Sequence, residues 1–177
     1  MANAQYQRNL DDALSWLELY DTTLSEINDI LQAAREEAVR GANGTHPDAS
    51  REAIAQKIEQ LYHQLIAVGN TQFKGKYIFN GKATQDKPYD IGDHLSANQQ
   101  PIEFEVMPRV KVKVNVLGSD VFGNAGPENA FRILLDLQQA IKDGKYDQIQ
   151  DAINRLDKRI DAVLTQWTDV GARMNRL

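Results

Sequence analysis

The fold is decided first by residues 10–38, which read LDDALSWLELYDTTLSEINDILQAAREEA. Apolar side chains recur along this stretch in alternating steps of three and four, which keeps them in one stripe on one helix face. The pattern predicts one long amphipathic helix. It should end within residues 40–48, RGANGTHPD, because two glycines and a proline disfavour helix there, and Asp48 or Ser50 should cap the next helix.

A second helix is predicted from Ile54 to Val68, where apolar residues repeat in the same rhythm, and it should end around Gly69 and Asn70. Since a short polar turn separates the two stripes, the helices should pack antiparallel as a hairpin. The predicted core of this helical rod, including its C-terminal helices, consists of apolar stripe residues: Leu17, Leu24, Leu31, Ile58, Leu61, Leu65, Leu134, Leu156, Ile160 and Trp167.

The C-terminal part of the chain predicts two more helices. Pro127 should lie in the first turn of a short helix that ends at Gly144. Residues 149–177 then keep a four-three rhythm to the last residue, and Asp147 with Gln150 resembles a capping box at the start of this helix. At about 1.5 Å per residue the last helix spans roughly 45 Å, which predicts an elongated rod.

Between the two helical parts the apolar period changes from 3.6 to 2. Residues 109–116, RVKVKVNV, place four valines on one face of a predicted strand, and residues 102–106 alternate in the same way. Residues 74–81, KGKYIFNG, predict a strand followed by a tight turn at Asn80 and Gly81. We therefore expect a mainly α protein with a small antiparallel β-insert: rod helices in 1–70, the β-insert in 71–126, and rod helices packing back in 127–177.

Composition and motifs exclude several classes of function. The chain has no cysteine, so it has neither disulfides nor thiolate metal sites, and its formal net charge of −5 disfavours binding to phosphate backbones or anionic membranes. His46, His63 and His94 share no metal or catalytic spacing, and the sequence contains no nucleotide-binding or nucleophile motif. We predict no catalytic residue, no metal site, no cofactor, no nucleic-acid partner and no membrane span.

Two features of the β-insert keep an alternative of another class open. The peptide KGKYIFNG resembles the aromatic octapeptide of an RNA-binding sheet, although its partner motif is absent. Asp86, Asp90, Asp93 and His94 supply oxygen and nitrogen ligands for a cation, although without EF-hand spacing. An RNA- or metal-binding module on the β-insert is therefore the alternative to a purely structural role.

Four stretches resemble the flagellin superfamily. Residues 31–45, LQAAREEAVRGANGT, are similar to the first rod helix of flagellin and its polar turn. Residues 69–89, GNTQFKGKYIFNGKATQDKPY, instead resemble the family of filament-side flagellar hook-associated proteins. The segment 115–123, NVLGSDVFG, and the end 160–177, IDAVLTQWTDVGARMNRL, are similar to the same family. The resemblance covers nearly the whole chain and implies a flagellin D1-like helical bundle.

The resemblance implies a structural role in the bacterial flagellum rather than catalysis. A protein of this family would join the hook to the filament outside the cell, after unfolded export by the flagellar type III system. Its partners would be other copies of itself, the first hook-associated protein, flagellin and an export chaperone. A flagellin-type filament subunit is the runner-up within the same class.

The resemblance also bears on individual residues and on the ends of the chain. Arg35, Glu36 and Val39 match the flagellin pattern and are candidates for a surface where subunits pack, whereas Ala33 and Glu37 depart from it. Because helical patterns run almost to both ends of the sequence, we expect the chain to be a fragment that lacks the terminal assembly helices of the family.

Overall fold

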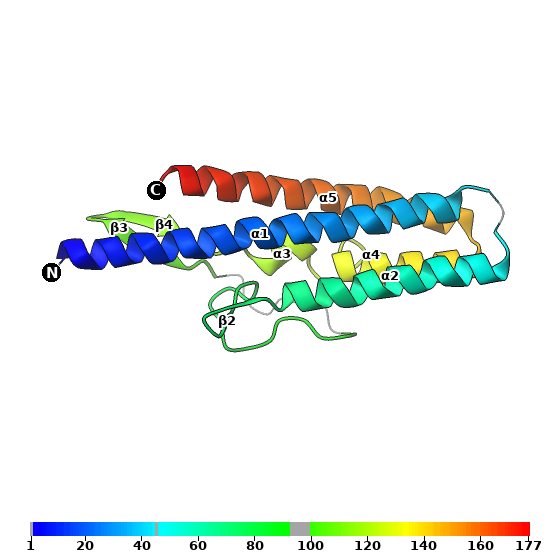
Figure 1. Cartoon of the computed structure of the whole chain (residues 1–177), viewed down its shortest axis with the longest axis horizontal. Helices are drawn as coiled ribbons and strands as arrows, with labels where there is room; N and C mark the ends of the chain where they lie inside the picture. The colour runs from blue at the N-terminus through cyan, green and yellow to red at the C-terminus, as the bar shows by residue number, and fades with distance from the viewer. Residues whose placement is uncertain (1, 45, 93–99) are drawn as a thin grey trace.

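The computed structural model describes residues 2–44, 46–92 and 100–177 and shows an elongated helical rod with a small β region on one side (Figure 1). Both ends of the chain lie at the same end of the rod (Figure 1). The elements follow in this order: α1 Ala2–Ala42, α2 Asp48–Gly69, β1 Gln72–Phe73, β2 Lys76–Tyr77, β3 Glu103–Met107, β4 Val110–Lys113, α3 Gly118–Phe122, α4 Ala130–Asp143 and α5 Tyr146–Asn175. The predicted fold class, mainly α with a small antiparallel β part, is confirmed.

The four long helices form two side-by-side pairs. α1 packs along α5, and α2 packs along α4, with α1 also contacting α2 and α4 contacting α5. Each helix presents an apolar stripe to its neighbours, so burial of these stripes drives the bundle together. The molecule is long because α1 and α5 contain 41 and 30 residues.

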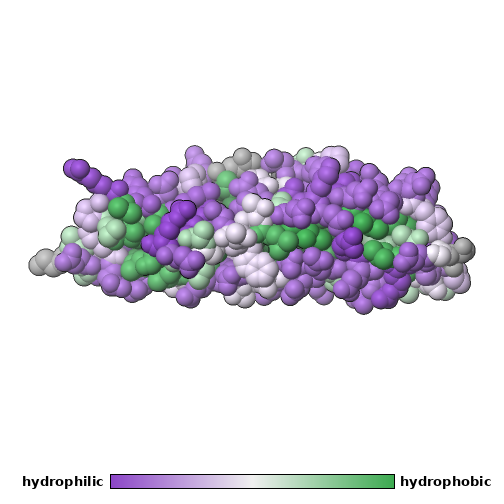
Figure 2. Space-filling model, turned by 90° about the horizontal axis from the view of Figure 1, so that it is seen from above, coloured by the Kyte–Doolittle hydropathy of each residue, from purple (hydrophilic) through white to green (hydrophobic). Residues whose placement is uncertain are grey.

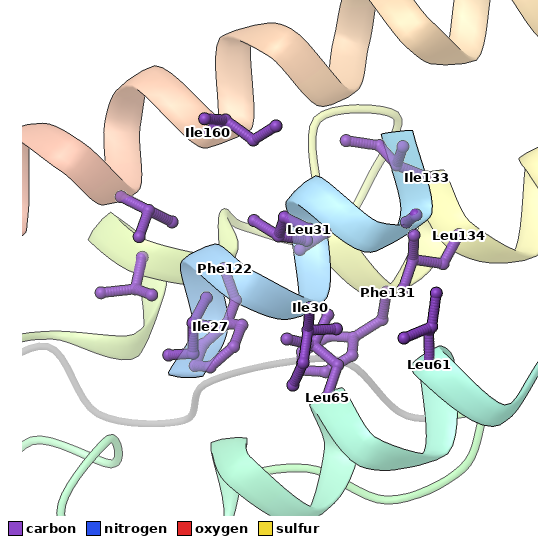
Figure 3. Packing of buried hydrophobic residues seen from close by; sticks show 14 of the residues in the cluster. Ile27, Ile30, Leu31, Leu61, Leu65, Phe122, Phe131, Ile133, Leu134 and Ile160 are labelled. Carbon is purple, nitrogen blue, oxygen red and sulfur yellow. The ribbon is translucent and has the colours of Figure 1, made fainter. Parts of the chain in front are cut away.

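The core runs through the middle of the bundle. Figure 3 shows side chains of all five helices pointing into one interior, including Ile27, Leu61, Phe122, Phe131 and Ile160. Every residue of the predicted rod core is buried except Trp167, which is partly buried. Trp167 instead lies where α5 contacts α1, and its Nε1 donates to Asp21 Oδ1 at 2.6 Å.

The starts of three helices differ from the sequence-based expectation. α2 begins directly after Pro47, whose φ of −58° suits a helix start, and neither Asp48 nor Ser50 forms a side-chain cap. Asn129, rather than Pro127, precedes α4, since its Oδ1 accepts from the backbone N–H groups of Phe131 at 3.0 Å and Arg132 at 3.2 Å.

The capping box predicted for the last helix is wrong. α5 already begins at Tyr146, one residue before Asp147, and follows Lys145 without any side-chain cap. The Lys145 N–H instead donates to the carbonyl of Ala140 at 3.0 Å, next to Gly144, which has φ of +63°. A tight C-terminal turn of α4 therefore sets where α5 starts.

The first hairpin of the β-insert turns at a different place from the one expected. β1 and β2 pair antiparallel with Phe73 opposite Lys76, so the two-residue turn is Lys74 and Gly75, with φ of +51° and +79°. Positive φ at both positions matches the right-handed twist of a hairpin. Asn80 and Gly81 form a separate turn in which the Ala83 N–H donates to the Asn80 carbonyl at 2.9 Å.

The second hairpin is shorter than the valine alternation predicts. β4 ends at Lys113, so Val114 and Val116 continue into the core as irregular chain and are fully buried, whereas Val110 at the hairpin tip is 41% exposed. The pairing with β3 shifts between Glu105 and Met107, and this bulge bends the tip. The four valines therefore do not share one buried face.

A short helix that the sequence analysis did not predict, α3, follows this hairpin. Arg159 in α5 fixes the segment around α3. Its guanidinium donates to the carbonyls of Val121 at 3.1 Å and Glu128 at 3.1 Å. Burial lowers the pKa of Arg159, with a smaller opposite effect from Glu128. Gly123 permits this approach, since a Cβ there would lie 2.9 Å from the Arg159 Nη2.

Candidate assembly surface

The face of α1 that points away from the bundle is acidic. Exposed carboxylates recur along it at Glu18, Glu26, Asp29 and Glu36, which we call the acidic stripe. None of the four makes an ion pair with the residues that the structure describes. The spacing of eight, three and seven residues keeps the stripe on one side of the helix. An exposed charged face without ion pairs to the described part of the chain can contact other molecules.

The three candidate packing residues lie in different environments. Arg35 is bound within the rod, because its Nε donates to Asp157 Oδ1 of α5 at 2.6 Å, and this hydrogen bond raises the pKa of Arg35. Val39 is half-buried against the core, and Glu36 alone faces solvent fully. The structure therefore brings Arg35 to α5 and leaves only Glu36 of the three in the acidic stripe.

Glu37 departs from the flagellin pattern and has a structural role here. Its carboxylate is buried between α1 and α2, where Oε1 lies 3.2 Å from the Lys57 Nζ and 3.5 Å from the Arg40 Nη1. A buried carboxylate needs such cationic partners to offset its desolvation. The ion pair with Lys57 joins α1 to α2, whereas Arg40 belongs to α1 itself.

Aromatic residues attach the β-insert to α1. Trp16 lies 5.3 Å from Phe73 between ring centroids, Tyr20 lies 5.6 Å from Phe79, and the Tyr20 hydroxyl donates to the Ile78 carbonyl. Burial raises the pKa of Tyr20 above its usual value, with smaller opposite effects from the Val116 backbone and Arg173. Phe79 of the peptide KGKYIFNG is fully buried, so it cannot stack on a base.

A groove opens where the β-insert meets α1. It has a volume of about 660 Å³, and we call it the lysine groove. Its apolar wall includes Trp16 and Phe104, and its polar lining includes Lys76, Lys82, Lys111 and one carboxylate, Glu103. Lys76 and Lys111 make no ion pair with the described residues. Positive charge therefore gathers in this groove on a chain whose formal net charge is −5.

The outer face of the rod is otherwise mainly hydrophilic. Figure 2 shows the side on which α5 lies, with polar residues covering most of it and separate hydrophobic patches between them. One shallow hollow at the seam of α1 and α5 is lined by Leu164, Trp167 and Gly171.

The cation-binding alternative gains no support from the described residues. Asp90 pairs with Lys87 at 2.9 Å, while Asp93 and His94 lie outside the described residues. Within residues 2–44, 46–92 and 100–177 no group of three or more histidine, aspartate or glutamate side chains converges as metal ligands do. None of the helices described is both long enough and apolar enough to cross a membrane.

Comparisons with known proteins give the family context. Residues 1–84 match the model of the bacterial flagellin N-terminal helical region. Over 200 residues the chain is 27% identical to flagellar hook-associated protein 3 of Escherichia coli K12, covering 99% of this chain and 63% of that relative. It is 24% identical to flagellin of Bacillus subtilis over 184 residues, covering 96% of this chain and 59% of that relative. The chain thus spans about three-fifths of the length of these relatives.

Solved structures show the likeness of fold. A putative flagellar hook-associated protein from Vibrio parahaemolyticus superposes with a TM-score of 0.91 at 21% identity, over 99% of this chain and 81% of that chain. Flagellin of Bacillus cereus superposes with a TM-score of only 0.55 at 18% identity, over 97% and 89%. Across these comparisons, residues 1–84 match the bacterial flagellin N-terminal helical region, and along nearly its whole length the chain is similar to flagellar hook-associated protein 3.

Proposed function

We propose that this chain is the rod and β-insert of a flagellar junction protein, which links the hook to the flagellin filament and has no catalytic role. The observation that carries the proposal is the similarity to flagellar hook-associated protein 3 along 99% of the chain, together with the rod-shaped fold. We further propose that the protein acts outside the cell after export by the flagellar type III system.

The proposed partners follow from the position of a junction protein between the hook and the filament. They are other copies of the same protein, the first hook-associated protein on the hook side and flagellin on the filament side, with an export chaperone before assembly. We also propose that residues 1–70 and 127–177 act as one rod and that residues 71–126 form a distinct β-insert. The contacts of α1 with α5 and of α2 with α4 support this grouping of the helices.

A flagellin-type filament subunit is the second candidate, and the similarity to curated flagellins favours it. The two candidates differ in how assembly stops. A junction protein adds a limited number of copies, whereas a filament subunit adds to its own end without limit. The weaker structural similarity to flagellin supports the junction role over the filament role.

The test is to add the complete protein containing this chain to isolated hooks that bear the first hook-associated protein, and to count incorporated copies by electron microscopy. A short collar that saturates is expected. Continued growth into a filament would make the protein a flagellin, and no incorporation would contradict both candidates. The variant Leu156→Asp, which places a charge in the buried stripe of α5, is the control for a disrupted rod.

A further inference from the structure

We propose that the lysine groove of one copy binds the acidic stripe on α1 of a second copy. This inference rests on the proposed function, because it assumes that copies of the protein assemble. It goes beyond that function by naming the two surfaces that meet. Charge, apolar surface and position on the helix support this contact.

The charges of the two surfaces are complementary. The lysine groove contains three lysines and one carboxylate, and the acidic stripe contains four carboxylates. Lys76, Lys111 and the four stripe residues form no ion pairs with the described residues, so their charges are not already neutralised within the chain. Complementary patches of this kind orient partners and suppress wrong pairings.

Both surfaces also include apolar side chains. The groove has an aromatic wall of Trp16 and Phe104 beside its lysines. Next to Glu26 and Asp29 of the stripe lies a shallow hollow of about 400 Å³, with an apolar floor of Ile30, Ala67 and Val68. Each surface therefore combines apolar side chains with charged ones, mainly basic in the groove and acidic in the stripe, as protein interfaces commonly do.

The positions of the two surfaces determine the kind of contact. Trp16 and Glu18 are two residues apart on α1, so they point in directions that differ by about 200° around the helix. Most of the stripe therefore points away from the groove, while Glu26, ten residues from Trp16, lies about 80° from it around the helix. A straight helix cannot fold its own stripe back into the groove. The contact must join different surfaces of successive copies, and such a contact produces a ring or a helical row.

Charge reversal tests the pairing in the complete protein. The groove variant Lys76→Glu/Lys111→Glu and the stripe variant Glu26→Lys/Asp29→Lys should each raise the concentration needed for half-maximal incorporation onto hooks about tenfold. A mixture of the two variants should regain the wild-type value. In that mixture the acidic groove of one variant meets the basic stripe of the other, and the remaining groove and stripe have their original charges.

Control variants keep the result specific. Lys142→Glu/Lys145→Glu makes the same change in net charge as the groove variant, at exposed positions near the α4–α5 turn, and it should leave incorporation unchanged. All variants should show the wild-type circular dichroism, because every substituted side chain is exposed. Their melting temperatures show whether Lys111→Glu, which lies opposite Glu105, loosens the β3–β4 hairpin.

The outcomes separate this inference from the proposed function. If the wild-type protein incorporates and both reversal variants incorporate equally well, or if the mixture fails to recover, the groove-to-stripe contact is overturned while the proposed function stands. If the wild type does not incorporate at all, both are overturned. If the groove instead binds a single-stranded oligonucleotide at low salt, and only the groove variant loses that binding while assembling normally, the groove serves a polyanion and the inference is again overturned.

Discussion

Arg173 of α5 donates from its Nη1 to the backbone carbonyl of Asn115 at 2.9 Å, across 58 positions of sequence. Asn115 in turn accepts from the Ile102 N–H through its Oδ1 at 2.8 Å and donates to the Gln100 carbonyl at 3.2 Å. Both residues are buried. One cation near the end of the rod therefore holds both chain segments that lead into and out of the β3–β4 hairpin.

Replacing Arg173 should loosen the hairpin from the rod. We expect Arg173→Met to lower the free energy of unfolding by about 2 kcal/mol, because a buried carbonyl loses a charged hydrogen-bond donor. Chemical denaturation measures this change. Arg176→Met is the matched control, since Arg176 is exposed and should change stability by less than about 0.5 kcal/mol. Equal effects of the two variants would contradict the role assigned to Arg173.

Two leucines of α5 should differ strongly in their contribution to stability. Leu156 is fully buried, whereas Leu164 is 39% exposed two turns later on the same helix. Leu156→Ala should cost about 2–5 kcal/mol by removing core contacts and leaving a cavity. Leu164→Ala should cost under about 1 kcal/mol, since much of that side chain already contacts water. Thermal unfolding of the two variants in parallel compares them, and a similar loss for both would mean that the register of α5 is wrong.

Two helical glycines should respond in opposite directions to alanine. A Cβ at Gly171 would meet no atom within 4 Å, so Gly171→Ala should stabilise the protein by about 0.5–1 kcal/mol through helix propensity alone. A Cβ at Gly69 would lie 2.9 Å from the Tyr89 Cδ2, so Gly69→Ala should destabilise it by about 1–3 kcal/mol through overpacking. Melting temperatures of the two variants check both signs, and a loss of stability for Gly171→Ala would indicate a contact missing from this account.

Tyr20 should make the protein less stable in alkali. Burial raises its pKa above the usual value of about 10, so the unfolded chain loses the hydroxyl proton at a lower pH than the folded chain does. The stabilisation is fully present below pH 10 and falls as pH rises above it, by at most about 1.4 kcal/mol per pH unit from this one group.

Comparison with Tyr20→Phe isolates that effect. The variant loses the hydrogen bond to Ile78 and should be less stable at neutral pH, but its free energy of unfolding should fall less steeply between pH 10 and 11. Denaturation at a series of pH values gives both slopes. Parallel slopes for the two proteins would show that Tyr20 ionises as easily in the folded chain as in the unfolded one.

The helical part of the fold was largely predictable because its signal is local. The three-four spacing of apolar residues located α1, α2, α4 and α5 and nine of the ten expected core residues. Helix starts were predicted less well, since several neighbouring residues can each act as the start or cap of a helix. Asn129 caps α4 although Pro127 has the more conspicuous start signal, and α5 starts from a turn that depends on Gly144.

The β-insert was predicted only in outline. Alternation identified the strand at residues 110–113. It could not show that the chain leaves the sheet at Val114, because that depends on the neighbouring core in which Val114 is buried. The hairpin turn at Lys74 and Gly75 was missed in favour of Asn80 and Gly81, although both pairs have glycine second. The burial of Phe79 against Tyr20 could not be predicted either, because Tyr20 belongs to α1, a distant part of the chain.

The acidic stripe and the lysine groove also differ in how far the sequence predicts them. The acidic stripe can be read from the spacing of carboxylates along α1, since a single helix orders them. The lysine groove cannot, because Trp16, Lys76 and Lys111 come from three distant segments that only folding brings together. The sequence by itself determined the helices, their apolar faces and the family resemblance, because these depend on neighbours three or four residues apart. Only the tertiary structure decided where the β-insert docks, that Arg35 is bound to Asp157, and which charges remain available, because these depend on contacts between residues far apart in the chain.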